Sequence, residues 1–148
     1  MSLETKIMQQ LKIAMKEKNT IALESLRAVK SAILLEKTKQ KDSVMTEDDE
    51  IRLLQRLVKQ RKDSAEIYQS QNREDLAETE LKQVEIIAQF LPKQMNKEEV
   101  ETVVAEIIAQ VGAESMKDMG KVMGIASKKM AGKAEGKLIS TIVKEKLG

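Results

Sequence analysis

Cysteine, histidine and tryptophan are all absent from this chain of 148 residues. Without cysteine it can form no disulfide, thiolate metal site or cysteine nucleophile. Without histidine it lacks the commonest general base, the commonest zinc ligand and the Ser-His-Asp arrangement. No Gly-x-Ser-x-Gly motif indicates an activated serine. The residues therefore predict no catalytic group, no metal site and no cofactor.

Aromatic residues and long apolar runs are also scarce. Tyr68 and Phe90 are the only aromatic residues, which makes recognition of single strands by base stacking a poor explanation. The run from Ala32 to Leu35 is among the longest apolar stretches, whereas a bilayer span needs roughly 20 residues. The polar N-terminus lacks the apolar core of a signal peptide. We expect no membrane segment and a cytoplasmic protein.

Proline and glycine are few and unevenly placed. Pro92 is the single proline, and all six glycines lie in the last 37 residues. Because these residues interrupt regular structure, long helices are expected before Pro92. Short helices joined by glycine turns are expected after it, at Gly112, Gly120, Gly124, Gly132 and Gly136. No strand-like alternation is present. The sequence predicts an all-α protein with a long-helix hairpin or bundle at 1–93 and a small helical domain at 94–148, able to move relative to each other.

Apolar periodicity and capping residues locate the helices. The expected helices run over about 3–18, 20–40, 47–71, 73–91, 97–111, 116–130 and 137–146. Thr46 and Asn96 are expected to cap the third and fifth of these helices. Met15 and Leu81 are expected on the inward faces of the first and fourth.

Charge separates the last 33 residues from the rest. The range 116–148 holds eight lysines and three acidic residues, a net of +5, whereas the remainder has 18 basic and 21 acidic residues. A compact basic module favours a polyanionic partner, and RNA is the first to consider. Lys37 and Lys39, outside the module, are expected to have their field diluted by acidic neighbours.

The segment GKAEGK at 132–137 invites comparison with a phosphate-binding loop. A Walker A loop has four residues between its glycines and Ser or Thr after the lysine, but here the spacer is three residues and Leu138 follows. A nucleotide site is therefore not expected. Two interpretations remain equally open. A tight glycine turn feeding a helix N-terminus can hold an RNA phosphate beside lysines, or the segment is an ordinary turn with solvated lysines.

Gly120 and Gly124 stand four residues apart among several methionines. The favoured interpretation is close helix packing, with methionine filling the gaps. The alternative is close approach of an RNA backbone beside Lys121 and Lys128.

Several motifs together resemble the YqeY proteins of bacteria. They are RLVKQRKDSA at 56–65, NREDLA at 72–77, FLPKQM at 90–95, KDMGKVMG at 117–124 and GKAEGKL at 132–138. The resemblance covers nearly the whole chain. The C-terminal part is also similar to the tail of GatB, a subunit of the tRNA-dependent amidotransferase, and the tail motif is the most specific piece.

The resemblance implies two helical domains and a C-terminal part that contacts tRNA. The implied contacts are Lys121, Lys128, Lys129, Lys133 and Lys137, with Gly120, Gly124, Gly132 and Gly136 shaping the backbone. Glu135 stands where the family usually has aspartate, which keeps the charge. The chain has neither the catalytic cradle of GatB nor the amidase part of its partner subunit.

Three functions follow as hypotheses. The leading one is a tRNA-interacting accessory protein of the amidotransferase system, without catalysis of its own. The second is a component of a carbon–nitrogen ligase complex that uses glutamine as amido donor and includes amidotransferase subunits. The third is a protein-interaction module whose methionine-rich C-terminal surface receives a partner helix.

Overall fold

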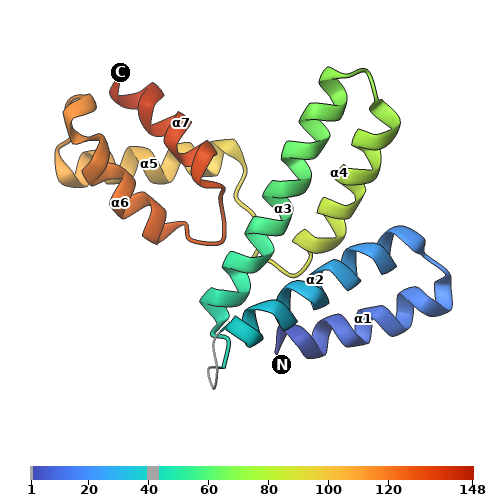
Figure 1. The fold of residues 1–148 in the computed structure, drawn as a ribbon. Helices are drawn as coiled ribbons and strands as arrows, with labels where there is room; N and C mark the ends of the chain where they lie inside the picture. The colour runs from blue at the N-terminus through green and yellow to red at the C-terminus, as the bar shows by residue number, and fades with distance from the viewer. Residues whose placement is uncertain (1, 40–43) are drawn as a thin grey trace. The chain divides into compact units, whose positions relative to one another are not determined.

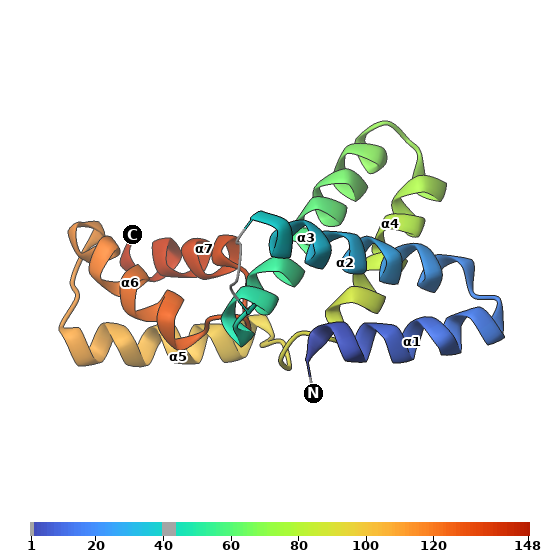
Figure 2. The same cartoon turned by 60° about the horizontal axis from the view of Figure 1, so that its bottom comes forward.

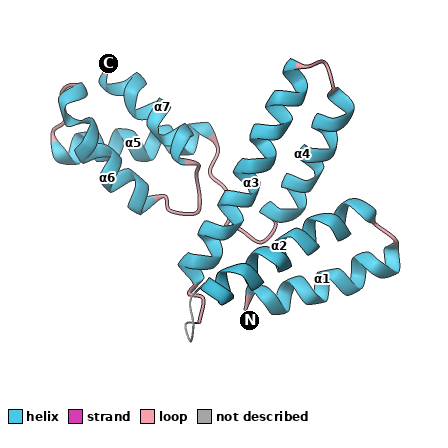
Figure 3. Ribbon diagram, viewed as in Figure 1, coloured by secondary structure: helices cyan, strands magenta, loops and turns pink. Residues whose placement is uncertain are grey.

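The computed structural model describes residues 2–39 and 44–148. Within these ranges the chain forms helices and no strand, as Figure 3 shows. The predicted all-α fold class is thus confirmed. The chain divides into two compact units, Met1–Leu91 and Pro92–Gly148. The expected boundary at 93/94 falls in the same non-helical segment, and independent motion of the two parts stays a prediction.

The first unit consists of two antiparallel helix pairs (Figure 1). The pairs are α1 (Leu3–Glu17) with α2 (Thr20–Lys39), and α3 (Glu47–Ser70) with α4 (Glu74–Ala88). In addition α2 packs against α4 and α3, which joins the two pairs into one body. The expected end of the second helix at Gln40, and most of the connector after it, lie outside the described residues.

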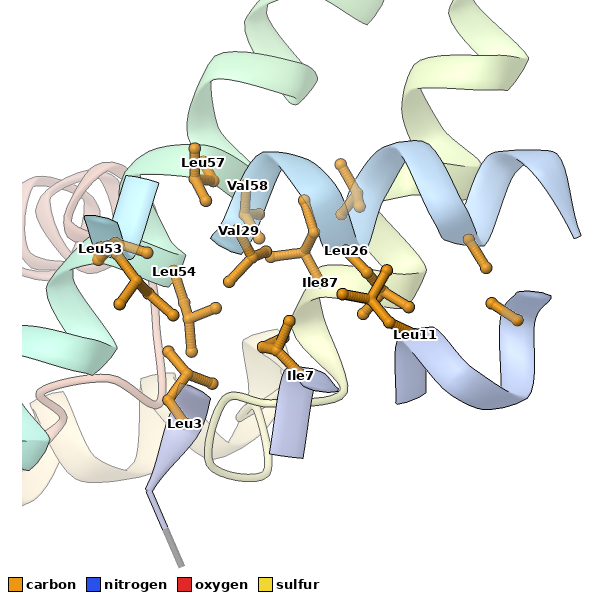
Figure 4. Packing of buried hydrophobic residues seen from close by; sticks show 14 residues of the cluster. Leu3, Ile7, Leu11, Leu26, Val29, Leu53, Leu54, Leu57, Val58 and Ile87 are labelled. Atoms are coloured by element: carbon orange, nitrogen blue, oxygen red, sulfur yellow. The ribbon is translucent and has the colours of Figure 1, made fainter. Parts of the chain in front are cut away.

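One apolar cluster holds the first unit together (Figure 4). Ile7, Val29, Leu54 and Ile87, one from each helix, are at most 1% exposed. Burial of a side chain of this kind contributes about 1.5–3 kcal/mol relative to leaving it exposed. The periodic apolar residues of four helices therefore meet in a single core.

Local side-chain caps explain where the helices of the first unit begin. The Ser2 hydroxyl accepts from the Thr5 N–H at the start of α1. At α3 the Thr46 hydroxyl accepts from the Asp49 N–H (3.1 Å), while the Thr46 N–H donates to the Asp49 carboxylate (3.0 Å). This reciprocal pair confirms the expected capping box. The bond from the Thr46 N–H is the main cause that lowers the pKa of Asp49 below its ordinary 3.8.

Two expected core residues are exposed instead. Met15 is 59% exposed, and Ala14 takes its place in the core. A strict spacing of four residues drifts by about 40° per step around a helix with 3.6 residues per turn. By the fourth member of the series Leu3, Ile7, Leu11, Met15 the side chain has rotated out. Leu81 is 40% exposed on α4, where Ala77, Val84 and Ile87 form the buried side.

The second unit is a helical bundle. Its helices are α5 (Lys97–Val111), the 3-10 turn η1 (Met116–Asp118), α6 (Met119–Lys129) and α7 (Gly136–Leu147). Of the α-helices only α6 and α7, of 11 and 12 residues, are short as expected. Helix α5 has 15 residues, the same length as α1 and α4 before Pro92. Val100, Val104, Val122, Met130 and Ile142 are among its buried residues. Asn96 caps α5 in the predicted capping box with Glu99, because its side chain accepts from the Glu99 N–H at 2.8 Å. The methionines at the two ends of the expected helix over 116–130 behave differently, since Met116 is exposed whereas Met130 is buried.

The helix ends and turns lie at the positions expected from proline and glycine only in part. The helix before Pro92 ends at Ala88, earlier than the predicted Leu91, through turn bonds from Phe90 N–H to Ile87 O and from Leu91 N–H to Ala88 O, both 3.1 Å. Gly112 and Gly132 adopt the left-handed conformation, with φ of 67° and 76°. The turns expected at the other three positions are wrong. Two of those glycines, Gly120 and Gly124, lie inside α6, and Gly136 begins α7.

Among the described residues, no helix combines the length and apolarity that crossing a bilayer requires.

Candidate nucleic-acid interface

The turn between α6 and α7 is held in one conformation by hydrogen bonds. Lys133 N–H and Ala134 N–H both donate to the carbonyl of Met130, at 2.9 and 3.3 Å. Gly132 is buried with a left-handed backbone that a side chain would strain. Ala134 is buried in the bundle core. Lys133, in contrast, is exposed, so a fixed backbone presents its side chain to solvent.

A second segment of the same unit clamps this turn. The Gln94 amide donates to the carbonyls of Gly132 (2.8 Å) and Pro92 (2.7 Å). The Met95 N–H donates to the carbonyl of Lys133 at 2.8 Å. Two family-like motifs, FLPKQM and GKAEGKL, therefore meet in space. Their contact fixes the turn that carries Lys133.

Helix α7 begins directly after this turn. Its N-cap is Glu135, whose side chain does not cap the helix, and Lys137 lies in the first turn. The first N–H groups of any α-helix have no partner within the helix and create positive potential there. Lys137 adds a full positive charge at this place. The uncapped helix start and the lysine together give local chemistry that suits a phosphate.

The glycines of α6 do not pack against another helix. A Cβ atom built on Gly120 or Gly124 would meet no atom within 4 Å, and both residues are exposed. The favoured interpretation as a close-packing site is therefore wrong for the described residues. The spacing i, i+3, i+7 places Lys121, Gly124 and Lys128 on one side of the helix. Helix α6 thus presents bare backbone beside two lysines.

All five candidate lysines lie in the second unit and are exposed. Lys121, Lys128 and Lys129 belong to α6, Lys133 to the turn and Lys137 to α7. In the described part of the chain none of the five is in an ion pair. Lys128 and Lys129 end α6 only a few residues before the turn of Lys133, so four of the five follow one another from the end of α6 into α7. A role in binding RNA stays a prediction.

The expected effect of acidic neighbours holds for Lys37 in its immediate surroundings but not for its segment of the chain as a whole. Residues 1–41 hold nine basic and four acidic residues, a net of +5, and residues 42–115 hold nine basic and seventeen acidic ones, a net of −8. The first 41 residues are therefore as basic as the C-terminal module. Lys37 itself is paired with Glu4. The net charge of −3 over residues 1–115 therefore combines a basic segment and an acidic segment.

No arrangement typical of catalysis stands out among the described residues. No group of three or more carboxylates could hold a metal ion there. The Ser25 hydroxyl, the one buried hydroxyl within 2–39 and 44–148, donates to the carbonyl of Ile21 at 2.8 Å. A pocket of about 190 Å³ between α1, α2 and α4 is lined by apolar and amide side chains and one carboxylate, that of Glu17.

The comparisons with known proteins settle the family. A family model described as Yqey-like protein matches residues 4–147. The chain belongs to the YqeY-like family. The resemblance stated from the motifs is thus confirmed, including the weaker similarity of its C-terminal part to the tail of GatB-type subunits.

Two curated proteins are similar to parts of this YqeY-like chain. A glutamyl-tRNA(Gln) amidotransferase subunit of Thermococcus gammatolerans is 40% identical over 57 residues, which are 36% of this chain and 9% of that protein. Altered inheritance of mitochondria protein 41, mitochondrial, of Clavispora lusitaniae is 40% identical over 82 residues, 55% of this chain and 46% of that protein. The chain therefore matches less than half the length of either relative. The expected cytoplasmic location stays a prediction.

Proposed function

We propose that this YqeY-like protein is a tRNA-interacting accessory protein whose second unit binds the RNA, and that it performs no catalysis alone. The observation that carries the proposal is the set of five exposed lysines without a carboxylate partner on one small unit. Unpaired exposed cations attract a phosphate backbone and release its counterions on binding.

The geometry around these lysines supports recognition of the phosphate backbone of RNA. Gly120 and Gly124 leave the surface of α6 open, so a phosphate chain can approach the helix more closely than side chains would permit. The turn that carries Lys133 is clamped by Gln94, which lowers the entropy lost when this part of the surface binds. With Tyr68 and Phe90 as the only aromatic residues, the surface suits a duplex backbone better than stacked single-stranded bases.

The similarity to an amidotransferase component supports tRNA as the RNA. The relative is named for glutamyl-tRNA(Gln), and the C-terminal part resembles the tail of such subunits. A chain whose C-terminal part resembles the tail of such a subunit fits an accessory role in handling tRNA.

Removal of two lysines at the clamped turn tests the proposal. The full chain is titrated with tRNA, and Lys133→Ala/Lys137→Ala is compared with the wild type. We expect affinity to fall on the order of tenfold or more at low salt, with stability changed by less than about 0.5 kcal/mol per exposed site.

The matched control is Lys59→Ala/Lys82→Ala, which removes the same charge from lysines already paired with Asp63 (3.0 Å) and Glu78 (3.1 Å). We expect this variant to bind nearly as well as the wild type. Equal losses in both variants, or no binding of tRNA by the wild type at low salt, would refute the proposed site.

A second candidate function is a component of a carbon–nitrogen ligase complex. The similarity to the amidotransferase protein of Thermococcus gammatolerans favours it. Purified chain incubated with glutamine should release no ammonia above a no-enzyme control, because it has no cysteine to act as the nucleophile and no histidine to act as the general base. Stable co-purification with amidase-type subunits would support this function, whereas ammonia release by the chain alone would contradict the non-catalytic role.

The third candidate, a protein-interaction module, is an outcome of the same titration. Met116, Met119 and Met123 give the second unit some accessible methionine surface. A partner-binding affinity that salt does not change, together with no binding of tRNA, would favour this function over the first.

A further inference from the structure

The outward side of the α1–α2 pair carries a mixed basic and apolar surface. On α1, Met8, Lys12 and Met15 share one side through the spacing i, i+4, i+7. On α2, Arg27, Lys30 and Leu34 share one side through the spacing i, i+3, i+7. We call these six residues the hairpin face.

An ion pair shows that the two rows of the hairpin face lie next to each other. Glu4 stands one helical turn before Met8, and Lys37 stands one turn after Leu34. The Lys37 ammonium pairs with the Glu4 carboxylate across the two helices. Figure 2 shows α1 and α2 running side by side. The α1 residues and the α2 residues of the hairpin face both begin one helical turn from this ion pair. They therefore lie next to each other on the same side of the helix pair.

Neither the apolar nor the basic side chains of the hairpin face are paired or covered within the described structure. Met8, Met15 and Leu34 are 39%, 59% and 51% exposed. Lys12, Arg27 and Lys30 form no ion pair in the described part of the chain. A phosphate backbone would satisfy the charges and leave the apolar side chains in water. A surface that is both acidic and apolar would satisfy both components.

Helix α4 of the same unit has a surface of that kind. Glu74, Glu78, Leu81 and Glu85 follow the spacing i, i+4, i+7, i+11, and all four are exposed. We call these four residues the α4 face. Leu81 is 40% exposed at its centre. Glu78 pairs with Lys82 at 3.1 Å, while Glu74 and Glu85 have no ion pair among the described residues.

We propose that the protein associates with a second copy of itself, the hairpin face of one copy docking on the α4 face of the other. The rows have comparable lengths, about 10 Å on α1 and about 16 Å on α4. In a two-fold pair each copy docks its hairpin face on the α4 face of the other, so the contact forms twice. Each face is small, so the association is weak and depends on salt. This inference does not depend on RNA binding.

Charge reversal tests the proposal with the full chain alone. The molar mass in solution is measured against protein concentration for the wild type, Lys12→Glu/Arg27→Glu and Glu78→Lys/Glu85→Lys. We expect the mass of the wild type to rise with concentration at low salt and to return to the monomer value at high salt. Each reversed variant alone should stay monomeric, since like charges then face each other.

Mixing the two reversed variants gives the sharpest readout. In an equimolar mixture one contact regains complementarity through the swapped charges and the other keeps its native charges, so association should return. The matched control Lys6→Glu/Lys39→Glu changes the same charge on the same helices outside the hairpin face, and should associate like the wild type. A monomeric wild type at high concentration and low salt, or a mixture no heavier than its components, overturns the proposal.

Discussion

Two glycines, Gly120 and Gly124, make helix α6 less stable than alanine would, and the fold does not require glycine at either position. Glycine inside a helix is less favourable than alanine by about 0.8–1.0 kcal/mol. An added Cβ at Gly120 or Gly124 would meet no neighbour within 4 Å. These glycines are therefore free to change without steric conflict in the unbound protein, which fits a surface kept open for a ligand.

Alanine at these two positions should raise stability and lower RNA affinity. We expect Gly124→Ala to raise the free energy of unfolding by roughly 0.5–1 kcal/mol, with a similar or smaller gain for Gly120→Ala near the helix start. Thermal unfolding measures the first effect and a tRNA titration the second. Gly132→Ala is the contrasting variant, because its φ of 76° strains alanine and should lower stability. A destabilised Gly124→Ala would show that the α6 surface is covered in the free protein.

The capping carboxylate of Asp49 should make stability depend on acid pH. Its pKa is lowered in the folded chain mainly by the Thr46 N–H, from an ordinary value of 3.8. A lowered folded pKa adds stability that is complete above the unfolded value and is lost as the pH falls through the folded value. Denaturant unfolding of the wild type and Asp49→Asn should differ at neutral pH and converge well below pH 3.8. A gap that persists in acid would mean that the cap does not depend on the ionised carboxylate.

At the scale of elements, the contact between residues 92–95 and the turn before α7 is the feature that shapes the candidate interface. Gln94 donates to Gly132 O and Met95 donates to Lys133 O, both at 2.8 Å. The segment after Pro92 therefore supports the turn of the basic surface. It does this through the side-chain amide of Gln94 and the backbone N–H of Met95, neither of which carries a charge.

Loss of the Gln94 amide should loosen this turn. We expect Gln94→Ala to lower stability by about 1 kcal/mol, the usual net value of a hydrogen bond within a protein. Amide hydrogen exchange should become faster at Met95 and Ala134, and tRNA affinity should fall although no charge is removed. Lys93→Ala, at an exposed neighbouring position, serves as the control for exchange. Unchanged exchange at Met95 would show that Gln94 does not support the turn.

The elements also show what could be predicted from the sequence. The caps at Thr46 and Asn96 were predictable because each signal spans only four consecutive residues. The prediction that Met15 and Leu81 face inward was wrong, because both are exposed. Apolar character alone does not show at which residue a periodic series has rotated away from the buried side of its helix. The bond from Gln94 to Gly132 joins residues 38 apart in the chain, and no local pattern indicates such a contact. The sequence identified the five candidate lysines as basic residues. Only the structure of the described residues shows that they form no ion pair.

At the scale of the whole molecule, charge alternates along the chain. The net charge is +5 over residues 1–41, −8 over 42–115 and +5 over 116–148. We propose that the last of these segments neutralises phosphates of tRNA. The proposed association between copies uses Lys12, Arg27 and Lys30 of the basic first segment. Measurements on the protein alone can separate this association from RNA binding.

The salt dependence of tRNA binding tests this claim most directly. Each phosphate neutralised contributes a slope of about −0.9 to log K against log of the salt concentration on a duplex. We predict a clearly negative slope for the wild type, and one less steep by up to about 2 for Lys133→Ala/Lys137→Ala. The slope of Lys59→Ala/Lys82→Ala should match that of the wild type. A wild-type slope near zero, or the same slope in the Lys133→Ala/Lys137→Ala variant, would show that these lysines do not neutralise phosphates of tRNA.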